Sequence, residues 1–140
     1  MHIITVGAPK LAYAKIGWDE YLQRLRHFHT VRVTRVADKN NDADHLLAAA
    51  VKTTLVALVI DGPQFSSPQL AGFLAKRALQ SREVSFIIGG PDGLPPEVIA
   101  RADYSWGLSA LTFPHDLAMV ILLETLYRAS TINSGQPYHK

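Results

Sequence analysis

The 140-residue sequence contains no cysteine. This absence excludes a disulfide scaffold, a cysteine-ligated zinc site and a cysteine nucleophile, and it is compatible with a reducing compartment. Long hydrophobic runs are absent too, because the most apolar stretch, residues 117–123, is far too short to span a bilayer and is followed by Glu124. Residues 1–7 have neither the basic region nor the long apolar core of a signal peptide. We therefore expect a cytoplasmic protein without a membrane partner.

Strong charge of either sign is also lacking. The formal net charge is only +2 and the isoelectric point is about 9.0, which permits nucleic-acid binding without establishing it. Hydrophobic residues make up 48% of the chain, and the mean hydropathy of +0.07 is high for a small monomer. We therefore expect a single domain, residues 1–140, that buries a real core and covers further apolar surface by forming a homodimer.

Apolar, β-rich runs alternate with helical patterns along the chain. Strands are predicted at residues 3–6, 31–36, 55–60, 84–88 and 104–108, and helices at residues 18–28, 42–51, 66–80, shortly after Pro96, and 115–132. This alternation predicts an α/β fold with a mostly parallel sheet flanked by helices. Ligands of such sheets bind beyond the carboxyl ends of the strands, which points to the loops after Ile60, Ile88 and Leu108.

A glycine-rich loop, Gly89-Gly90-Pro91-Asp92-Gly93, follows the buried run that ends at Ile88. Glycines at this place let the backbone approach a ligand where a Cβ atom would clash. The loop is neither a P-loop, since no Gly-Lys-Ser/Thr follows, nor the dinucleotide GxGxxG pattern. It suits a nucleoside ligand without a phosphate chain, and the alternative is a tight turn between a strand and a helix.

A loop of small and polar residues, 105–114, precedes the last predicted helix. Thr112 is expected to cap this helix, Pro114 fits its first turn and Asp116 complements the helix dipole. The dipole disfavours the charged form of His115, which permits a neutral imidazole near pH 7, and the alternative is a surface or capping histidine. The loop either presents backbone donors to a ligand or simply forms a well-capped helix start.

The last predicted helix and the tail after it carry two further signals. Residues 117–123 are apolar on every side, which implies a second covering surface. Glu124 and Arg128 are spaced i,i+4 and either pair with each other or serve a function. The terminal Tyr138 and His139 either fray with the chain end or stack on a nucleic-acid base.

Residues 24–35 carry four arginines and two histidines with no acidic residue between them. Such a stretch contacts backbone phosphates or is a solvated basic face. His27 and His29 lie close together but lack a nearby carboxylate, so we expect no metal site.

Four segments in this order resemble one family. They are Ile88-Gly89-Gly90-Pro91-Asp92-Gly93-Leu94, Thr112-Phe113-Pro114-His115, Leu126-Tyr127-Arg128-Ala129 and Tyr138-His139. Together they resemble the ribosomal RNA large subunit methyltransferase H family, the bacterial pseudouridine N3-methyltransferases of 23S rRNA. The resemblance covers essentially the whole chain, and the last three segments are its most specific part. The stretch of residues 37–42 is shorter than the resemblance leads us to expect.

The resemblance implies a SPOUT α/β fold with a deep trefoil knot near the C-terminus, a homodimer, and S-adenosylmethionine bound in the knotted loops. The cofactor contacts that it implies are Leu58, Gly90, Ser109, Ala110, Leu111, Thr112, Phe113 and Pro114. The candidate catalytic residues are His115, Arg128, Tyr138 and His139. A histidine acts as a general base in such chemistry and an arginine stabilises developing negative charge.

The implied partner is ribosomal RNA or the assembled ribosome, and the implied activity is methylation of N3 of a pseudouridine. Three alternatives stay open at this point. The first is a SPOUT enzyme that acts on another rRNA position or on tRNA. The second is a non-catalytic ribosome-binding module, and the third is a general nucleotide-binding α/β protein, although the sequence lacks the phosphate-binding fingerprints.

Overall fold

The computed structural model describes residues 1–140 and consists of one parallel sheet between two layers of helices. The strands, in the spatial order β2-β1-β4-β3-β5, are β1 His2–Val6, β2 Arg32–Val36, β3 Thr54–Leu58, β4 Val84–Ile88 and β5 Tyr104–Trp106. The helices are α1 Ala12–Arg26, α2 Ala43–Ala49, α3 Ser67–Leu79, α4 Pro96–Arg101 and α5 His115–Asn133, with a short 3-10 turn at Asp38–Asn40. The predicted α/β class with a parallel sheet is confirmed.

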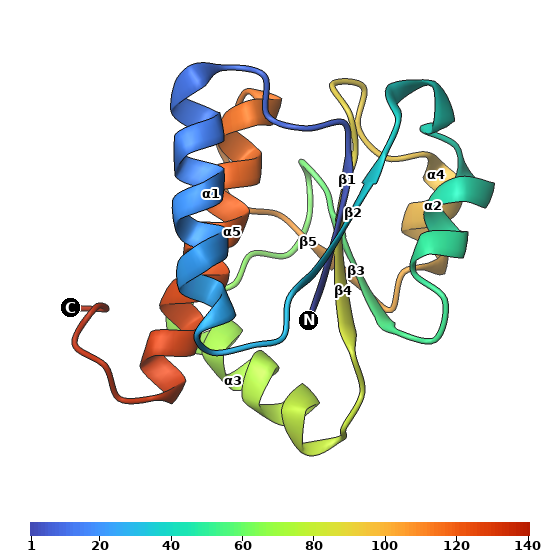
Figure 1. Ribbon diagram of the computed structural model, residues 1–140. Coiled ribbons are helices and arrows are strands. Elements are labelled where there is room, and N and C mark those ends of the chain that lie inside the picture. Colours follow the sequence, from blue (N-terminus) through green and yellow to red (C-terminus); the bar gives the residue numbers. More distant parts are fainter.

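The two helical layers are unequal (Figure 1). Helices α1, α3 and α5 cover one face of the sheet, and the shorter helices α2 and α4 cover the other. Alternate strand residues therefore enter different cores: Ile3 and Phe86 face the larger layer, while Ile4 and Ile87 face the smaller one. Every residue of β1, β3 and β4 is buried, which explains their near-continuous apolar sequences.

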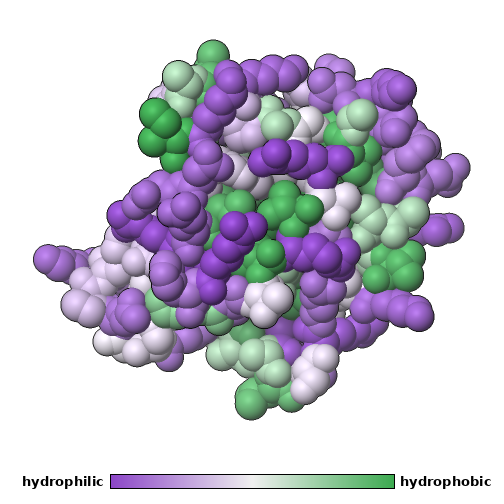
Figure 2. Space-filling view, in the orientation of Figure 1, coloured by the Kyte–Doolittle hydropathy of each residue, from purple (hydrophilic) through white to green (hydrophobic).

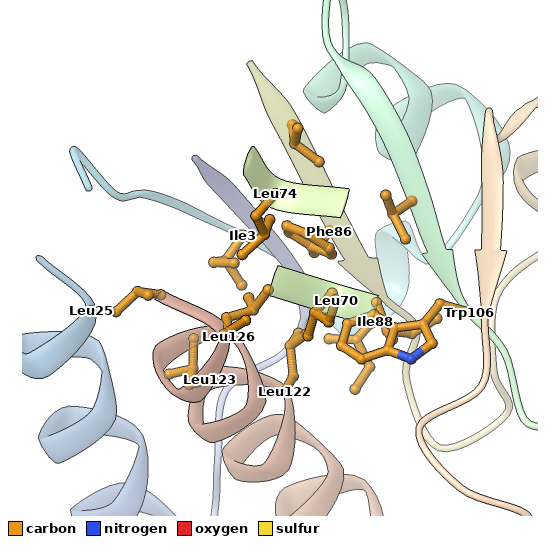
Figure 3. Packing of buried hydrophobic residues seen from close by; sticks show 14 of the residues in the cluster. Ile3, Leu25, Leu70, Leu74, Phe86, Ile88, Trp106, Leu122, Leu123 and Leu126 are labelled. Atoms are coloured by element: carbon orange, nitrogen blue, oxygen red, sulfur yellow. The ribbon is translucent and has the colours of Figure 1, made fainter. Parts of the chain in front are cut away.

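Helix α5 fills the centre of the larger layer, between α1 and α3. Its buried leucines, among them Leu122 and Leu126, meet Phe86 and Ile88 of β4 and Leu70 of α3 (Figure 3). The helix is less enclosed than its sequence suggests. The side of α5 that carries Leu117, Val120 and Ile121 is only half-buried in the chain alone.

Three local predictions need correction or refinement. Helix α1 begins at Ala12, not at Trp18. Thr112 does not cap α5, because the residue before the helix is Pro114 and no side chain makes a capping bond there. Asp116 has a larger role than complementing the dipole, because its carboxylate accepts hydrogen bonds from the backbone N–H groups of Lys10 and Leu11 at 2.7 and 2.6 Å.

The surface along the β2 edge is mainly hydrophilic, with hydrophobic side chains near the middle of the face (Figure 2). Several large apolar side chains are exposed elsewhere, including Ile16, Ile60 and Leu111. None of the helices combines the length and the apolarity that crossing a bilayer requires.

Candidate functional site: a pocket of three loops and a distant cluster

A cavity of about 290 Å³ lies at the carboxyl ends of β3, β4 and β5. This volume is just below the usual range for small-molecule pockets, about 300–1,000 Å³. The cavity is lined by Leu58, Val59, Ile60, Ile88, Gly89, Gly90, Pro91, Gly93, Leu108, Ser109, Leu111, Thr112, Phe113, Pro114, His115 and Ala118. The three loops that the strand-end rule selects from the sequence therefore meet around one cavity.

Almost all predicted cofactor contacts line this cavity. The lining includes Leu58, Gly90, Ser109, Leu111, Thr112, Phe113 and Pro114, whereas Ala110 is not part of it. The apolar residues Ile60 and Leu108, predicted as strand ends, lie beyond the observed strands and form cavity wall instead. Apolar sequence at these places therefore belongs to the pocket and not to the sheet.

The glycine loop forms a tight turn that depends on Gly89. A Cβ atom at Gly89 would lie 2.3 Å from the carbonyl carbon and oxygen of Gly93, closer than real Cβ contacts. The turn is closed by a hydrogen bond from the Gly93 N–H to the Gly90 oxygen at 2.9 Å, and Gly93 has a φ of +81°. Sequence reasoning selected Gly90 and missed Gly89, since adjacent glycines look alike in a sequence.

Asn41, in the segment after β2, stabilises this turn. Its side-chain amide donates a hydrogen bond of 3.2 Å to the Gly93 oxygen. A Cβ atom at Gly90 would face Asn41 and Val6, at 3.6 and 3.3 Å. The unexpectedly short stretch of residues 37–42 therefore still supports the back of the pocket.

The loops after β3 and β5 touch at two glycines. A Cβ atom at Gly107 would lie 2.8 Å from the Gly62 oxygen, and the Gly107 N–H donates a 2.9 Å hydrogen bond to Pro63. Strand β5 lies beside β3 at one edge of the sheet. Helix α5 nevertheless begins beside β1, because the ring nitrogen Nε2 of His115 lies 3.2 Å from the Val6 oxygen. The chain between them therefore crosses the ends of β3 and β4.

His115 belongs to the pocket and stands in the first turn of α5. Because a carbonyl oxygen only accepts, the contact with Val6 requires the proton on Nε2. In the tautomer with this proton the free lone pair is on Nδ1, and a general base needs such a lone pair.

A second cluster lies on the C-terminal half of α5 and includes the tail. The Tyr138 hydroxyl donates a 3.0 Å hydrogen bond to Oε1 of Glu124, and the Arg128 guanidinium donates to the same oxygen. The Arg128 guanidinium carbon lies 4.8 Å from the Tyr138 ring centroid, and the rings of Tyr127 and Tyr138 meet edge to face at 4.7 Å. Fraying is therefore the wrong interpretation for Tyr138, whereas His139 is exposed.

Electrostatics in this cluster favour the protonated forms. Desolvation by burial, followed by hydrogen bonds with Tyr21 and Glu124, raises the pKa of Tyr138. The hydrogen bond with Glu124 raises the pKa of Arg128. At neutral pH the cluster therefore holds a neutral phenol and a guanidinium on one carboxylate.

The structure does not bring the four candidate catalytic residues together in one chain. His115 and Arg128 are on the same helix, and 13 residues of α-helix span about 20 Å. Tyr138 packs beside Arg128 and bonds to Glu124, and none of these three residues lines the pocket. Only His115 lies at the cavity.

The predicted basic stretch is partly neutralised. Arg24 pairs with Glu20 at 2.6 Å and Arg32 with Glu83 at 2.9 Å. His29 is half-buried, with its Nε2 nitrogen 2.8 Å from the Ser130 hydroxyl. No three histidine or carboxylate side chains come together in an arrangement that holds a metal ion.

Comparison with known proteins assigns the family. The family model described as a predicted SPOUT methyltransferase matches residues 1–139. The protein named ribosomal RNA large subunit methyltransferase H from Deinococcus deserti is 50% identical over 143 residues, which cover 100% of this chain and 99% of that protein.

Solved structures agree on the fold. A probable methylase family protein from Haemophilus influenzae superposes with a TM-score of 0.63 at 10% identity, covering 99% of this chain and 70% of that one. An AdoMet-bound rRNA methyltransferase from Sinorhizobium meliloti gives 0.52 at 11% identity, covering 91% and 55%. The chain therefore belongs to the SPOUT methyltransferase family and, within it, to the family of ribosomal RNA large subunit methyltransferase H.

Proposed function

We propose that this chain uses S-adenosylmethionine to methylate N3 of a pseudouridine in 23S rRNA of the large ribosomal subunit. We further propose that it acts in the cytoplasm, as a homodimer of a single SPOUT domain. The observation that carries the proposal is the cavity at the carboxyl ends of β3, β4 and β5, in a chain of this family.

The cavity fits the cofactor. Half of its 16 lining residues are hydrophobic, and neither lysine nor arginine is among them, which suits an adenosyl group better than a phosphate chain. One wall is the Gly89–Gly93 turn, which presents three glycines and Pro91 to the cavity and which a side chain at Gly89 would distort. Leu58 and residues 109–114 form the other walls, except for Ala110. When bound, S-adenosylmethionine supplies an electrophilic methyl group.

The residues of the chain then have to bind the acceptor base and remove its N3 proton. In this proposal the proton passes to Nδ1 of His115, because the contact with Val6 occupies Nε2 and leaves the lone pair of Nδ1 free. Arg128 stabilises the negative charge that develops on the base. Tyr138 and His139 hold the base by stacking, as aromatic side chains do with single-stranded nucleic acid.

A homodimer explains how groups about 20 Å apart act together. If two α5 helices pack antiparallel about a two-fold axis, Arg128 and Tyr138 of one chain approach His115 of the other. The half-buried side of α5, with Leu117, Val120 and Ile121, offers a surface for this contact. Exposed Ile16 of α1 continues the apolar surface, because its neighbour Gly17 packs against Val120.

We also propose that the crossing of the loops after β3 and β5 belongs to the trefoil knot that the family resemblance implies. The contact of Gly62 with Gly107 supports this, because two chain segments pass there with no space for a side chain. A knotted connection is a rare exception to ordinary topology, and it would hold residues 107–114 firmly around the ligand.

Mixing two inactive variants tests the proposed shared site. Arg128→Ala is expected to disable the acceptor cluster, and Gly89→Ala to leave the pocket largely empty when S-adenosylmethionine is kept well below the Kd of that variant. When the two variants are co-expressed with different tags, half of the dimers contain one chain of each. Each mixed dimer has one intact site out of two, so about a quarter of the normal methylation rate should return. Residual activity no greater than that of the separate variants would contradict a site shared between subunits.

Binding measurements separate the rival functions. Calorimetry should detect S-adenosylmethionine binding, with no comparable affinity for NAD or ATP. A chain that binds ribosomes but not S-adenosylmethionine would be a non-catalytic ribosome-binding module. A preference for NAD or ATP would indicate a general nucleotide-binding protein.

A further inference from the structure

Glu124 occupies the centre of the cluster at the end of α5. One of its carboxylate oxygens, Oε1, accepts hydrogen bonds from both Arg128 and Tyr138. Its side chain is only 21% exposed, compared with 50% for Glu20 in the corresponding pair on α1. A half-buried carboxylate with two donors on one oxygen is more constrained than a surface ion pair.

We propose that Glu124 is a positioning residue that holds Arg128 and Tyr138 together as one preformed acceptor-binding unit. This inference rests on the proposed function, which places Arg128 and Tyr138 at the acceptor base. Glu124 itself touches neither substrate nor cofactor in this account and acts through the two side chains that its Oε1 atom holds.

The contacts around Tyr138 show how the unit is built. The tail turns back at Gly135, whose φ is +68°, and the Tyr138 ring then packs edge to face on Tyr127. The hydroxyl donates to Glu124 and lies 3.3 Å from the Tyr21 hydroxyl, which is then the donor to Tyr138. Tyr138 is therefore held at its ring and at its hydroxyl by α5 and α1.

Arg128 gains its orientation from the same two partners. Its guanidinium donates to Glu124 and lies over the Tyr138 ring, 4.8 Å from the centroid. A free arginine side chain samples many rotamers and loses that freedom when it binds. Because Glu124 fixes the guanidinium beforehand, the ordering cost is met during folding and does not add to the barrier of the reaction.

The carboxylate also stabilises the protonated forms of both side chains. Its hydrogen bond raises the pKa of Arg128, and it contributes, after burial and Tyr21, to the raised pKa of Tyr138. Arg24 is the other charged group nearby, with its guanidinium carbon 5.7 Å from the Tyr127 ring centroid, and Glu20 neutralises it. Glu124 is thus the anion that balances Arg128.

A matched control exists on the neighbouring helix. Glu20 and Arg24 form an i,i+4 pair of the same two residue types on α1, and neither makes a hydrogen bond with the tail. Glu20→Gln and Glu124→Gln make the same chemical change, the removal of one charge with the shape kept. Only the second removes the anion that Arg128 and Tyr138 share.

The experiment compares the two full-length variants on intact ribosomes. For Glu124→Gln we expect kcat to fall about 10- to 100-fold, the effect of losing a hydrogen bond with a charged group. S-adenosylmethionine affinity, measured by calorimetry, should stay within about twofold, because Glu124 does not line the pocket and lies about 9 Å along α5 from Ala118, the nearest lining residue of that helix. Glu20→Gln should stay within about twofold in both quantities, as exposed ion pairs contribute little.

Further outcomes distinguish failure of this inference from failure of the proposed function. Full kcat in Glu124→Gln, with Arg128→Ala and Tyr138→Ala both impaired, would overturn the positioning role and leave the proposed function standing. Full kcat in all three variants would overturn both the positioning role and the placement of Arg128 and Tyr138 at the acceptor base, while loss of methylation by the unmodified chain itself would overturn the proposed function. A fall in kcat accompanied by an equal loss of S-adenosylmethionine affinity would overturn the positioning role, because it would show general damage to the fold.

Discussion

Replacing Gly89 by alanine should damage the pocket through a single added methyl group. Its Cβ atom would lie 2.3 Å from the Gly93 carbonyl and 2.6 Å from the Leu94 nitrogen. Ordinary van der Waals contact begins at 3.4 Å, so the backbone has to move by about 1 Å. Both partners are main-chain atoms, and therefore no flexible side chain can make room.

The expected loss follows from the bonds that close the turn. They are the Gly93 N–H to the Gly90 oxygen, at 2.9 Å, and the Asn41 amide to the Gly93 oxygen, at 3.2 Å. A neutral hydrogen bond contributes about 0.5–1.5 kcal/mol net, so losing both costs roughly 1–3 kcal/mol. If this cost appears in ligand binding, S-adenosylmethionine affinity falls roughly 5- to 150-fold.

Calorimetric titration of Gly89→Ala with S-adenosylmethionine measures this loss, and thermal unfolding shows whether the variant is folded. Gly72→Ala is the control, because a Cβ atom there meets nothing within 4 Å and the residue is inside α3. Alanine in a helix interior should stabilise the control by about 0.5–1 kcal/mol and leave binding unchanged. A folded Gly89→Ala protein with unaltered affinity would refute the assignment of the pocket.

Three further predictions concern the tail, the dimer and pH. Deleting residues 138–140 should slow methylation by about one to two orders of magnitude at low ribosome concentration and leave S-adenosylmethionine affinity unchanged; a truncated enzyme with the full rate would show that the tail is idle. Val120→Asp should weaken the dimer by about 3 kcal/mol or more, through a buried unpaired charge; sedimentation showing an active monomer of the unmodified chain would contradict the dimer. Burial lowers the pKa of His2 and of His29. Below about pH 6.5 the unfolded chain therefore takes up protons at these histidines that the folded chain does not. The free energy of unfolding should fall there by up to about 1.4 kcal/mol per pH unit for each histidine. Urea unfolding at pH 7.5 and 5.5 should show a smaller fall for His2→Gln, and equal stability of the unmodified chain at both pH values would speak against this.

The sequence predicts the alternation of strands and helices because burial on both faces of a parallel sheet leaves an unmistakable apolar run, as at β3 and β4. The start of α1 escapes prediction for a physical reason. Its first turns carry exposed apolar residues such as Ile16, and Gly17 interrupts the helical pattern. That glycine is required by packing, because a Cβ atom there would lie 2.9 Å from Val120 of α5.

Some features of the candidate site can be predicted from a short stretch of sequence, and others depend on contacts between residues far apart in the sequence. Strand ends and the glycine loop are local features, so most of the cavity lining follows from the sequence. The contact of His115 with Val6 and the role of Glu124 depend on residues that meet only in the fold. The ordered position of Tyr138 also escapes prediction, because its partner Tyr21 is 117 positions away along the chain.

The most direct test of the central claim is methylation of intact ribosomes with labelled S-adenosylmethionine, followed by mass-spectrometric mapping of the modified nucleotide. The account predicts one labelled methyl group, on N3 of a pseudouridine in 23S rRNA, whose incorporation falls with the Gly89→Ala variant at a cofactor concentration near the Kd of the unmodified chain. Label on a different nucleotide, or no transfer by a chain that binds S-adenosylmethionine and ribosomes, would contradict it.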